Sequence, residues 1–304
     1  MESQKKFDGL INDNGNQIAN PHINTQIDAN QIKVNAETYT AAESIDVNSI
    51  IVTIPDEKTP IVVLFGAPSS GKTLVLLRMI RFLEQNGYQV VPEEVFRPKT
   101  DRHYERMCSR LKDLAYSNYA PGGTDIISFM LVKVLDPVGN PVCQILEAPG
   151  EHYFDGSSSN AFPTYINRII NSKNRKIWMY FVEQNWGKDA NERALYAQKI
   201  SNVGSNPSKD STIFLFNKVD KYRNQFLPDG TPNMNVFFAM AKQQYPGIFE
   251  KYRNRGLMKV LYGTYNFRTL CFSTGTFNKT GDGREVWTLG EDRYCKDLWR
   301  AITK

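Results

Sequence analysis

The chain of 304 residues is long enough for one large α/β domain or two small ones. Hydrophobic residues make up 41% of it and charged residues 23%, which is ordinary for a globular protein with a sizeable core and unlike a disordered chain. The net charge of +5 includes no long run of Lys or Arg, which argues against a nucleic-acid partner.

Targeting signals and cysteine spacing indicate the compartment. No apolar segment of the signal-peptide type follows the first residues, and no stretch approaches the ~18 apolar residues of a membrane span. The cysteines are far apart and lack the spacing of metal ligands, so we expect reduced thiols at Cys108, Cys143, Cys271 and Cys295. These features predict a cytoplasmic protein without a transmembrane segment.

Residues 1–58 are predicted to form a polar, flexible N-terminal extension. The segment is rich in Asn and Gln and has no sustained hydrophobic period, so it cannot bury enough apolar surface to order itself alone. A short β-like run at residues 49–55 is either an edge strand or a docked part of this extension.

The domain predicted for the rest of the chain, residues 59–304, begins with a strand at 61–65 and a helix at about 74–86. A helical insertion is expected at about 88–123. Its first part is extended, and residues 101–117 then have the apolar spacing of an amphipathic helix with Asp101 as its cap.

The second half alternates strand-like and helix-like segments. Two strands joined by a Pro- and Gly-containing turn predict an antiparallel hairpin at 126–135 and 141–146. Further strands are expected at 176–182, 211–216 and 268–272, and helices at about 188–203, 235–253 and 290–302. This alternation predicts a three-layer α/β fold: a mostly parallel sheet with one antiparallel hairpin strand, helices on both faces, and ligands at the carboxyl ends of the strands.

A phosphate-binding loop lies between the first strand and the first helix. The segment from Gly66 to Thr73 is G-A-P-S-S-G-K-T, a full match to the pattern G-x-x-x-x-G-K-[ST] in the strand-loop-helix context that the pattern requires. Its glycines let backbone N–H groups face phosphate oxygens, and the helix start adds its own N–H groups. The predicted phosphate contacts are Gly66, Ala67, Pro68, Ser69, Ser70, Gly71, Lys72, Thr73 and Leu74.

Three more motifs follow later strands in a familiar order: Glu-x-x-Gly from Glu147, Asn-Lys-x-Asp from Asn217, and Ser-Thr-Gly from Ser273. From about residue 60 onward, roughly four fifths of the chain, this order resembles the Ras-like P-loop GTPases of the translation-factor-related (TRAFAC) class. The resemblance implies a P-loop NTPase fold, GTP and GDP as ligands, and Mg²⁺ as cofactor.

Base recognition is expected from Asn217, Lys218 and Asp220. The Asp220 carboxylate can accept hydrogen bonds from the N1–H and 2-amino groups of guanine, whereas adenine presents no matching pair of donors. In the family, the residue at Lys218 packs along the base and the one at Asn217 ties this loop to the phosphate loop. The resemblance adds Ser273, Thr274 and Gly275 as a final base-contacting loop.

The metal and the γ-phosphate involve a second set of residues. The resemblance implies Mg²⁺ ligands at Thr73, Thr124 and Glu147, with Thr100 competing for the place of Thr124. Glu147 stands where the family has Asp, and its extra methylene changes the geometry. Thr124 directly precedes a predicted strand, as a loop that closes on the metal would.

The residues after Glu147 are candidates for the hydrolytic step, together with Lys72 and Thr124. Gly150 is expected to meet the γ-phosphate and to act as a hinge. Glu151 stands where Ras-like proteins place the Gln that orients the attacking water, and its carboxylate would be repelled by the γ-phosphate unless it is protonated or turned away. His152 is either a substitute for that Gln or a surface histidine.

The sequence therefore predicts a nucleotide-dependent switch that hydrolyses GTP slowly without a partner. The alternative is a GTP-binding interaction module with little or no hydrolysis, as Glu147 and Glu151 suggest. A P-loop kinase or ATPase would leave the Asn-Lys-x-Asp motif without a role. Expected partners are a guanine nucleotide and a protein effector, an activating protein or a second copy of the chain. Arg97 and Arg102 lie in the range of an arginine finger, but neither can be assigned.

Overall fold

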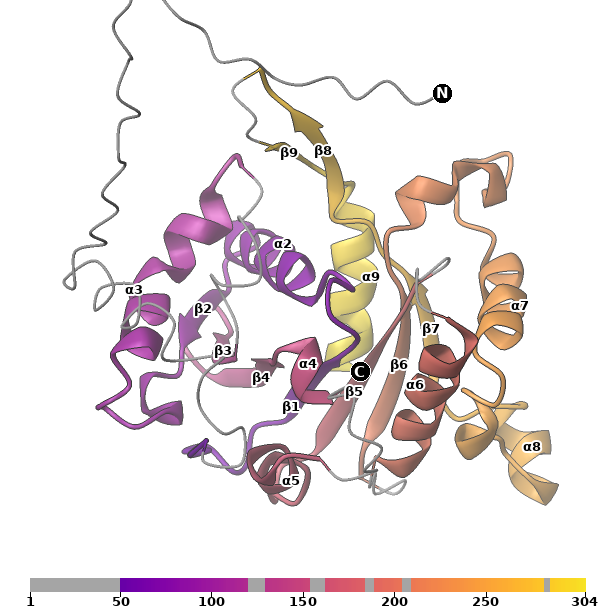
Figure 1. The fold of residues 1–304 in the computed structure, drawn as a ribbon, viewed down its shortest axis with the longest axis horizontal. Helices are drawn as coiled ribbons and strands as arrows, with labels where there is room; N and C mark the ends of the chain where they lie inside the picture. The colour runs from indigo at the N-terminus through magenta and orange to yellow at the C-terminus, as the bar shows by residue number, and fades with distance from the viewer. Residues whose placement is uncertain (1–49, 120–128, 154–161, 184–188, 204–208, 282–284) are drawn as a thin grey trace, which may run out of the picture. The chain divides into compact units, whose positions relative to one another are not determined.

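Seven strands form one sheet in the order β2-β3-β4-β1-β5-β6-β7 (Figure 1). The computed structural model describes residues 50–119, 129–153, 162–183, 189–203, 209–281 and 285–304. The strands are β1 (Ile61–Phe65), β2 (Gln89–Pro92), β3 (Met130–Leu135), β4 (Pro141–Glu147), β5 (Lys176–Val182), β6 (Ser211–Phe216) and β7 (Arg268–Cys271).

Strand β1 lies at the centre of this sheet and pairs in parallel with β4 on one side and β5 on the other. Strands β6 and β7 continue the parallel pairing, whereas β3 runs antiparallel to both β2 and β4. All five β1 side chains are buried, as expected for a strand covered on both faces. The predicted mostly parallel sheet with one antiparallel hairpin strand is confirmed.

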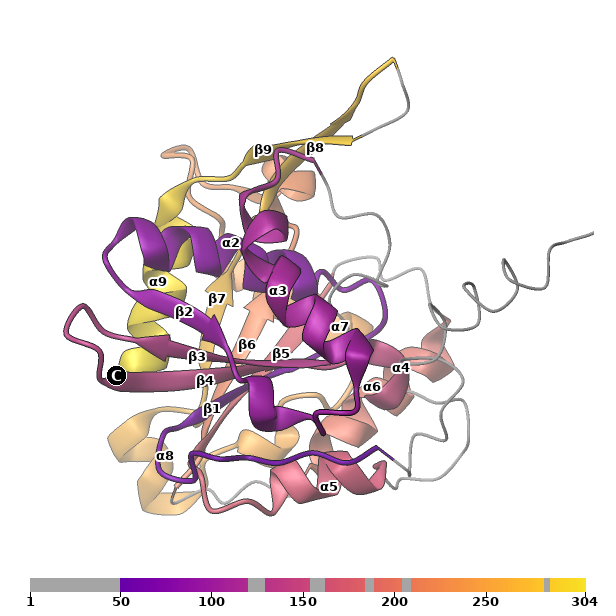
Figure 2. The ribbon, with the colours of Figure 1, turned by 90° about the vertical axis from the view of Figure 1, so that its left-hand side faces the viewer.

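Helices cover both faces of the sheet. The helices of the described residues are α2 (Lys72–Gln85), α3 (Arg102–Tyr116), α4 (Gly150–Tyr153), α5 (Thr164–Ile170), α6 (Ala190–Asn202), α7 (Met234–Gln244), α8 (Gly256–Tyr262) and α9 (Asp292–Thr303), of which all but α8 have side chains in the core. Helix α2 packs against β2, β4, α3 and α9, and α9 packs against β7. Figure 2 shows α2 above and α5 below the strands β3 and β4. With the β1-loop-α2 connection, this arrangement is the three-layer α/β fold of P-loop NTPases. No helix among the described residues is long and apolar enough to cross a bilayer.

The predicted insertion contains a strand as well as a helix. Its extended part forms β2, which pairs antiparallel with β3 at the sheet edge, and a 3₁₀ turn follows at Glu94–Phe96. Helix α3 then begins where the sequence predicts, with the Asp101 carboxylate accepting a hydrogen bond from the Tyr104 N–H at 3.0 Å.

The packed domain begins before the predicted boundary at residue 59. Val52 is buried in the core, and the Thr53 N–H donates to the Phe96 carbonyl at 2.8 Å. The Asp56 carbonyl accepts hydrogen bonds from the side chains of Gln144 and Asn174. Residues 50–58 are thus docked on the domain, and residues 1–49 lie outside the described part.

A second sheet, absent from the sequence-based expectation, follows β7. It is the hairpin of β8 (Gly275–Lys279) and β9 (Glu285–Leu289). Trp287 of β9 is buried, and the Arg81 guanidinium of α2 lies over the Trp287 ring at 4.8 Å from its centroid. Burial and the neighbouring Arg78 lower the pKa of the Arg81 guanidinium, which donates hydrogen bonds to the Ala115 and Ser117 carbonyls. The hairpin escapes pattern reading because its strands are only five residues long and mix apolar with exposed polar residues.

We expect Asp101→Ala to lower the free energy of unfolding by about 2–4 kcal/mol. The substitution removes the α3 cap and also the ion pair with the buried Arg97, whose Nη2 lies 2.8 Å from the carboxylate. Urea denaturation measures the effect, with Asp113→Ala on the exposed side of the same helix as the matched control. Equal losses in the two variants would contradict this role of Asp101.

Candidate nucleotide site

The loop between β1 and α2 has the backbone conformation of an anion cup. Ser69 and Gly71 adopt left-handed conformations, with φ of 61° and 89°, and Gly71 is the N-cap residue of α2. The loop therefore turns around the helix start, where unpaired backbone N–H groups and the positive end of the helix dipole favour an anion.

Both motif glycines stand where a side chain would not fit. A Cβ on Gly66 would lie 2.5 Å from Ser70 Oγ and 2.9 Å from Phe181 Cβ, and one on Gly71 would lie 2.5 Å from Asn217 Nδ2. The loop is thus held close to the ends of β5 and β6 as well as to its own helix.

Lys72 is turned onto the loop itself. Its Nζ donates to the carbonyls of Gly66 and Ala67, each at 3.0 Å, and the side chain is buried. A phosphate within the loop would give this ammonium a charged acceptor in place of two neutral ones, and hydrogen bonds to charged groups are the stronger.

The Asn-Lys-x-Asp motif follows β6 and contacts the phosphate loop directly. Asn217 Nδ2 donates to the Ser70 carbonyl at 2.8 Å, and Lys218 Nζ donates to the Ser69 carbonyl at 2.7 Å. Lys218 is itself left-handed, with φ of 59°, and pairs with Glu183 at 2.5 Å. The two motifs, 147 residues apart at the first contact, are thus in direct contact.

Asp220 contacts the third motif. Ser273 Oγ donates to Asp220 Oδ1 at 2.6 Å and in turn accepts from the Gly275 N–H at 3.2 Å. Trp287 Nε1 donates to the Thr274 carbonyl at 3.0 Å, so the β8–β9 hairpin fixes this loop. A carboxylate has about four acceptor positions, so the Ser273 bond orients Asp220 and leaves it able to accept further donors.

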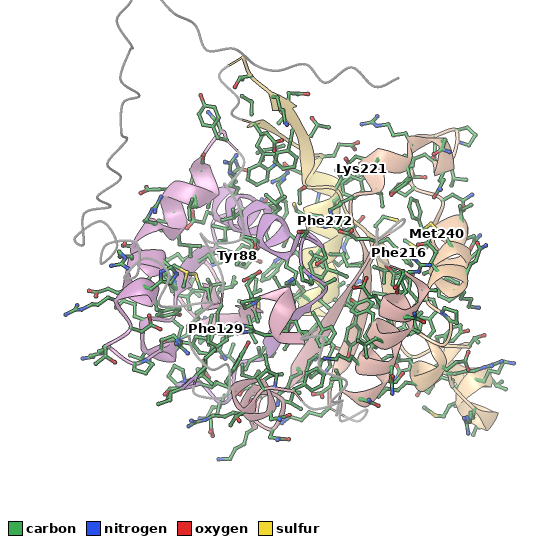
Figure 3. The ribbon with its side chains drawn as sticks, in the orientation of Figure 1. Tyr88, Phe129, Phe216, Lys221, Met240 and Phe272 are labelled. Atoms are coloured by element: carbon green, nitrogen blue, oxygen red, sulfur yellow. The ribbon has the colours of Figure 1, made fainter. Side chains whose placement is uncertain are left out.

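Main-chain hydrogen bonds at the carboxyl ends of β6 and β7 hold the Asn-Lys-x-Asp loop against the Ser-Thr-Gly loop. The Phe272 N–H donates to the Phe216 carbonyl at 2.8 Å, and Figure 3 labels both residues where their strands end. The Val219 N–H then donates to the Phe272 carbonyl at 3.2 Å. The second and third motifs are therefore joined through the main chain as well as through side chains.

Two of the predicted metal ligands are in contact. Thr73 Oγ1 donates to Glu147 Oε1 at 3.0 Å, and Glu147 is buried, with the Phe129 N–H donating to Oε2 at 3.3 Å. The donor set fits Mg²⁺, which prefers oxygen ligands and keeps several waters and phosphate oxygens in its shell. The described residues include no group of three or more His, Cys, Asp or Glu placed to hold a metal ion. Thr124 lies outside the described residues, and Thr100 is exposed before α3.

Gly150 packs against the phosphate loop. A Cβ at this position would lie 2.2 Å from the Pro68 backbone nitrogen and 2.5 Å from the Ala67 carbonyl carbon. The short helix α4 starts at Gly150 and includes Glu151 in its backbone; the Glu151 side chain lies outside the described part. The expectation that Gly150 approaches the phosphates is compatible with this position.

His152 is buried rather than on the surface. Its Nδ1 is hydrogen-bonded to the Tyr165 hydroxyl, and its ring packs edge-on against Phe129 and Tyr165, with centroids 6.3 Å and 5.5 Å away. Burial, together with the nearby Tyr153 and Glu147, raises the pKa of Tyr165, so this hydroxyl keeps its proton. The structure thus places the His152 ring of α4 in the core.

The two arginines considered as finger residues have other partners. Arg97 is buried, pairs with Asp101 and lies over the Phe129 ring at 5.1 Å, and Arg102 is exposed and pairs with Glu105 at 2.7 Å. Sequence reasoning missed Glu183, which anchors Lys218. Its place directly after β5, between the strands that carry the other motifs, was the available signal.

No protein-family model matches the chain, and no curated protein matches its sequence. Among solved structures, nucleolar GTP-binding protein 1 of Plasmodium falciparum is 15% identical over 73% of this chain and 80% of that chain, with a TM-score of 0.33. The signal recognition particle receptor SRb-GTP/SRX complex of Chaetomium thermophilum is 11% identical over 80% of this chain and 98% of that chain, with a TM-score of 0.39. A structure of the chloroplast translocon components atToc33 and psToc159 is 13% identical over 81% of this chain and 82% of that chain, with a TM-score of 0.39. Similarities this distant add nothing to the fold, which rests on the strand order and register.

We expect Gly71→Ala to destabilise the protein more than Gly139→Ala. Both glycines are left-handed, with φ of 89° and 92°, but only at Gly71 does a Cβ meet another atom, Asn217 Nδ2. The shared backbone cost is about 1–2 kcal/mol, and the clash adds about 1–3 kcal/mol at Gly71. Urea denaturation of both variants measures the difference, and equal losses would mean that Asn217 moves aside.

Proposed function

We propose that this protein binds guanine nucleotides with Mg²⁺ and acts as a nucleotide-dependent switch. The observation that carries the proposal is the hydrogen bond from Asn217 to the Ser70 carbonyl, which joins the base-recognition motif to the phosphate loop. A nucleotide has its base and its phosphates at opposite ends of one molecule, so a protein that binds both ends needs the two loops fixed side by side.

The phosphates would lie in the loop from Gly66 to Thr73, at the start of α2. Backbone N–H groups of Ser69 to Thr73 and the Lys72 ammonium would bind their oxygens. Thr73 and Glu147 would hold Mg²⁺, with Thr124 as a third proposed ligand. When bound, Mg²⁺ neutralises charge on the β- and γ-phosphates.

The base would lie between Lys218 and the Ser273–Gly275 loop. Asp220 would accept the N1–H and 2-amino protons of guanine, with Ser273 holding its carboxylate in position. Adenine would leave this carboxylate without donors, at the cost of an unpaired charge. The ion pair with Glu183 and the bond to Ser69 would hold the Lys218 stem along the base.

Hydrolysis is the finer part of the proposal. Water would attack the γ-phosphorus, the bond from that phosphorus to the β–γ bridging oxygen would break, and GDP and inorganic phosphate would result, while Lys72 binds the developing charge. Gly150, packed on the loop, would transmit the state of the phosphate to α4. Because Glu151 replaces a neutral amide and His152 is buried against Tyr165, intrinsic turnover would be slow, and a protein partner would be needed to accelerate it. The alternative is a GTP-binding interaction module with little or no hydrolysis.

Asp220→Asn should weaken GTP binding by about a hundredfold or more, because the amide presents a donor to the guanine donors. The same variant should gain affinity for xanthosine triphosphate, whose carbonyl at C2 accepts from that amide. Isothermal titration with GTP, ATP and xanthosine triphosphate in the presence of Mg²⁺ measures both effects.

Asp297→Asn is the matched control, since it makes the same change in an exposed ion pair on α9. ATP binding as tightly as GTP in the unmodified protein would exclude the guanine assignment, whatever the variants do.

Glu151→Gln should raise single-turnover phosphate release from bound GTP by at least about tenfold, since a neutral amide can orient water without repelling the γ-phosphate. Glu105→Gln, an exposed neutralisation on α3, should leave the rate unchanged. An unchanged rate in Glu151→Gln would remove the carboxylate as the reason for slow turnover, and no release from any variant would favour the interaction module.

A further inference from the structure

Helix α8 is apolar on nearly all sides and exposed to solvent. Of its seven residues, five are large hydrophobic side chains with high exposure: Leu257 72%, Met258 52%, Val260 80%, Leu261 61% and Tyr262 68%. These five are among only twelve large hydrophobic side chains exposed in the described part of the chain. A helix that is hydrophobic all round is normally buried, and exposed apolar patches mark interaction sites. We therefore expect a binding partner to cover α8.

The helix is held away from the domain by the two chain segments that flank it, residues 252–255 and 263–267, which we call the neck. The segments on either side of α8 form an antiparallel bridge between Arg253 and Tyr265, and the Asn254 N–H donates to the Thr264 carbonyl at 2.9 Å. Asn254 Nδ2 closes the same turn by donating to the Gly263 carbonyl at 2.8 Å. The apolar helix is therefore presented on a defined support, at the edge of the domain beyond α7 (Figure 1).

Aromatic packing anchors this neck to the main sheet. Tyr252 donates a hydrogen bond to the Tyr180 hydroxyl of β5 at 3.0 Å. Phe267 packs on Phe214 of β6 with ring centroids 4.7 Å apart, and Tyr265 packs on Phe267 at 5.1 Å. The hydrophobic core thus extends as far as the neck, and no α8 side chain is buried in that core.

Positive charge surrounds the exposed helix. Residues 250–265, which contain α8 and the segments that flank it, hold four Lys or Arg and one Glu, a net charge of +3. Arg255 and Lys259 are exposed at the start and in the middle of α8, and Arg253 lies in the neck, where it pairs with Glu250 at 3.4 Å. The rim of the apolar surface is therefore cationic.

These features fit one kind of partner. A protein groove covers one stripe of a helix and leaves a polar stripe to solvent, but α8 has no polar stripe. A seven-residue helix is about 10 Å long, too small to supply the ~800 Å² per partner of a typical stable dimer. A lipid bilayer surrounds an inserted group on all sides, and its anionic headgroups attract a cationic rim.

We propose that α8 inserts into the surface of an anionic phospholipid bilayer. The five apolar side chains enter the boundary between headgroups and acyl chains, which is about 5–10 Å deep. Arg253, Arg255 and Lys259 contact the headgroup phosphates, and Tyr262 lies at the level that amphipathic aromatic rings prefer. This attachment is peripheral and needs no nucleotide.

Co-sedimentation of the full chain with phosphatidylcholine vesicles, with and without phosphatidylserine, tests the proposal. We expect binding to the phosphatidylserine vesicles that weakens as salt is added. Leu257→Ser with Leu261→Ser should lower the partition coefficient by about tenfold or more, and Arg255→Glu with Lys259→Glu should abolish the preference for phosphatidylserine. Because these side chains are exposed, the variants should keep the unfolding midpoint of the unmodified protein.

Val138→Ser is the matched control, since Val138 is 82% exposed in the β3–β4 turn. Its vesicle binding should equal that of the unmodified protein. Absence of sedimentation with either vesicle, or equal binding by the Leu257→Ser/Leu261→Ser variant, would overturn the proposal. So would a dimer in analytical ultracentrifugation that dissociates in this variant while vesicles bind nothing, since a second copy would then cover α8. The experiment omits nucleotide, so its outcome is independent of guanine binding.

Discussion

The pairing of β1 on both sides is the constraint on which the rest of the structure depends. Because β4 and β5 run parallel to β1, their carboxyl ends reach the same edge of the sheet as the phosphate loop. Glu147 and Glu183 arrive there at the ends of these neighbours, and β6 adds Asn217 one strand further. A single register therefore assembles groups that are far apart in sequence, and burial of β1 on both faces fixes that register.

The sequence was sufficient for the fold because its strongest signals were apolar runs of strand length between helical periods. Residues 176–182 and 211–216 are strands with the predicted bounds. Elements without such long apolar runs or helical periods were missed: β8 and β9 are short and mix apolar with polar residues, and α8 has the composition of a buried strand although it is an exposed helix. At the N-terminal side, the sequence left open whether residues 49–55 dock on the domain, because the burial of Val52 and the hydrogen bond from Thr53 to Phe96 depend on partners distant in the chain.

For the candidate site, sequence order predicted which loops meet but not how their side chains are held. The motif spacing gave Asn217, Asp220 and Ser273, and the geometry adds that Asn217 contacts Ser70 and that Ser273 orients Asp220. Pattern reading treated His152 as a loop residue, since only the tertiary packing of Tyr165 reveals that the ring is buried. Local patterns carry residue type and position, whereas burial depends on partners distant in the chain.

The two proposed surfaces lie at opposite ends of the same strands. The neck of α8 leads through Phe267 into the amino end of β7, and the Ser273–Gly275 loop follows its carboxyl end. A four-residue strand is about 13 Å long, so the two surfaces are separated by at least the length of β7. A bilayer bound at α8 would leave the nucleotide loops facing away from it, open to exchange and to a protein partner. The parallel topology that gathers the loops at one edge is thus also what keeps α8 clear of them.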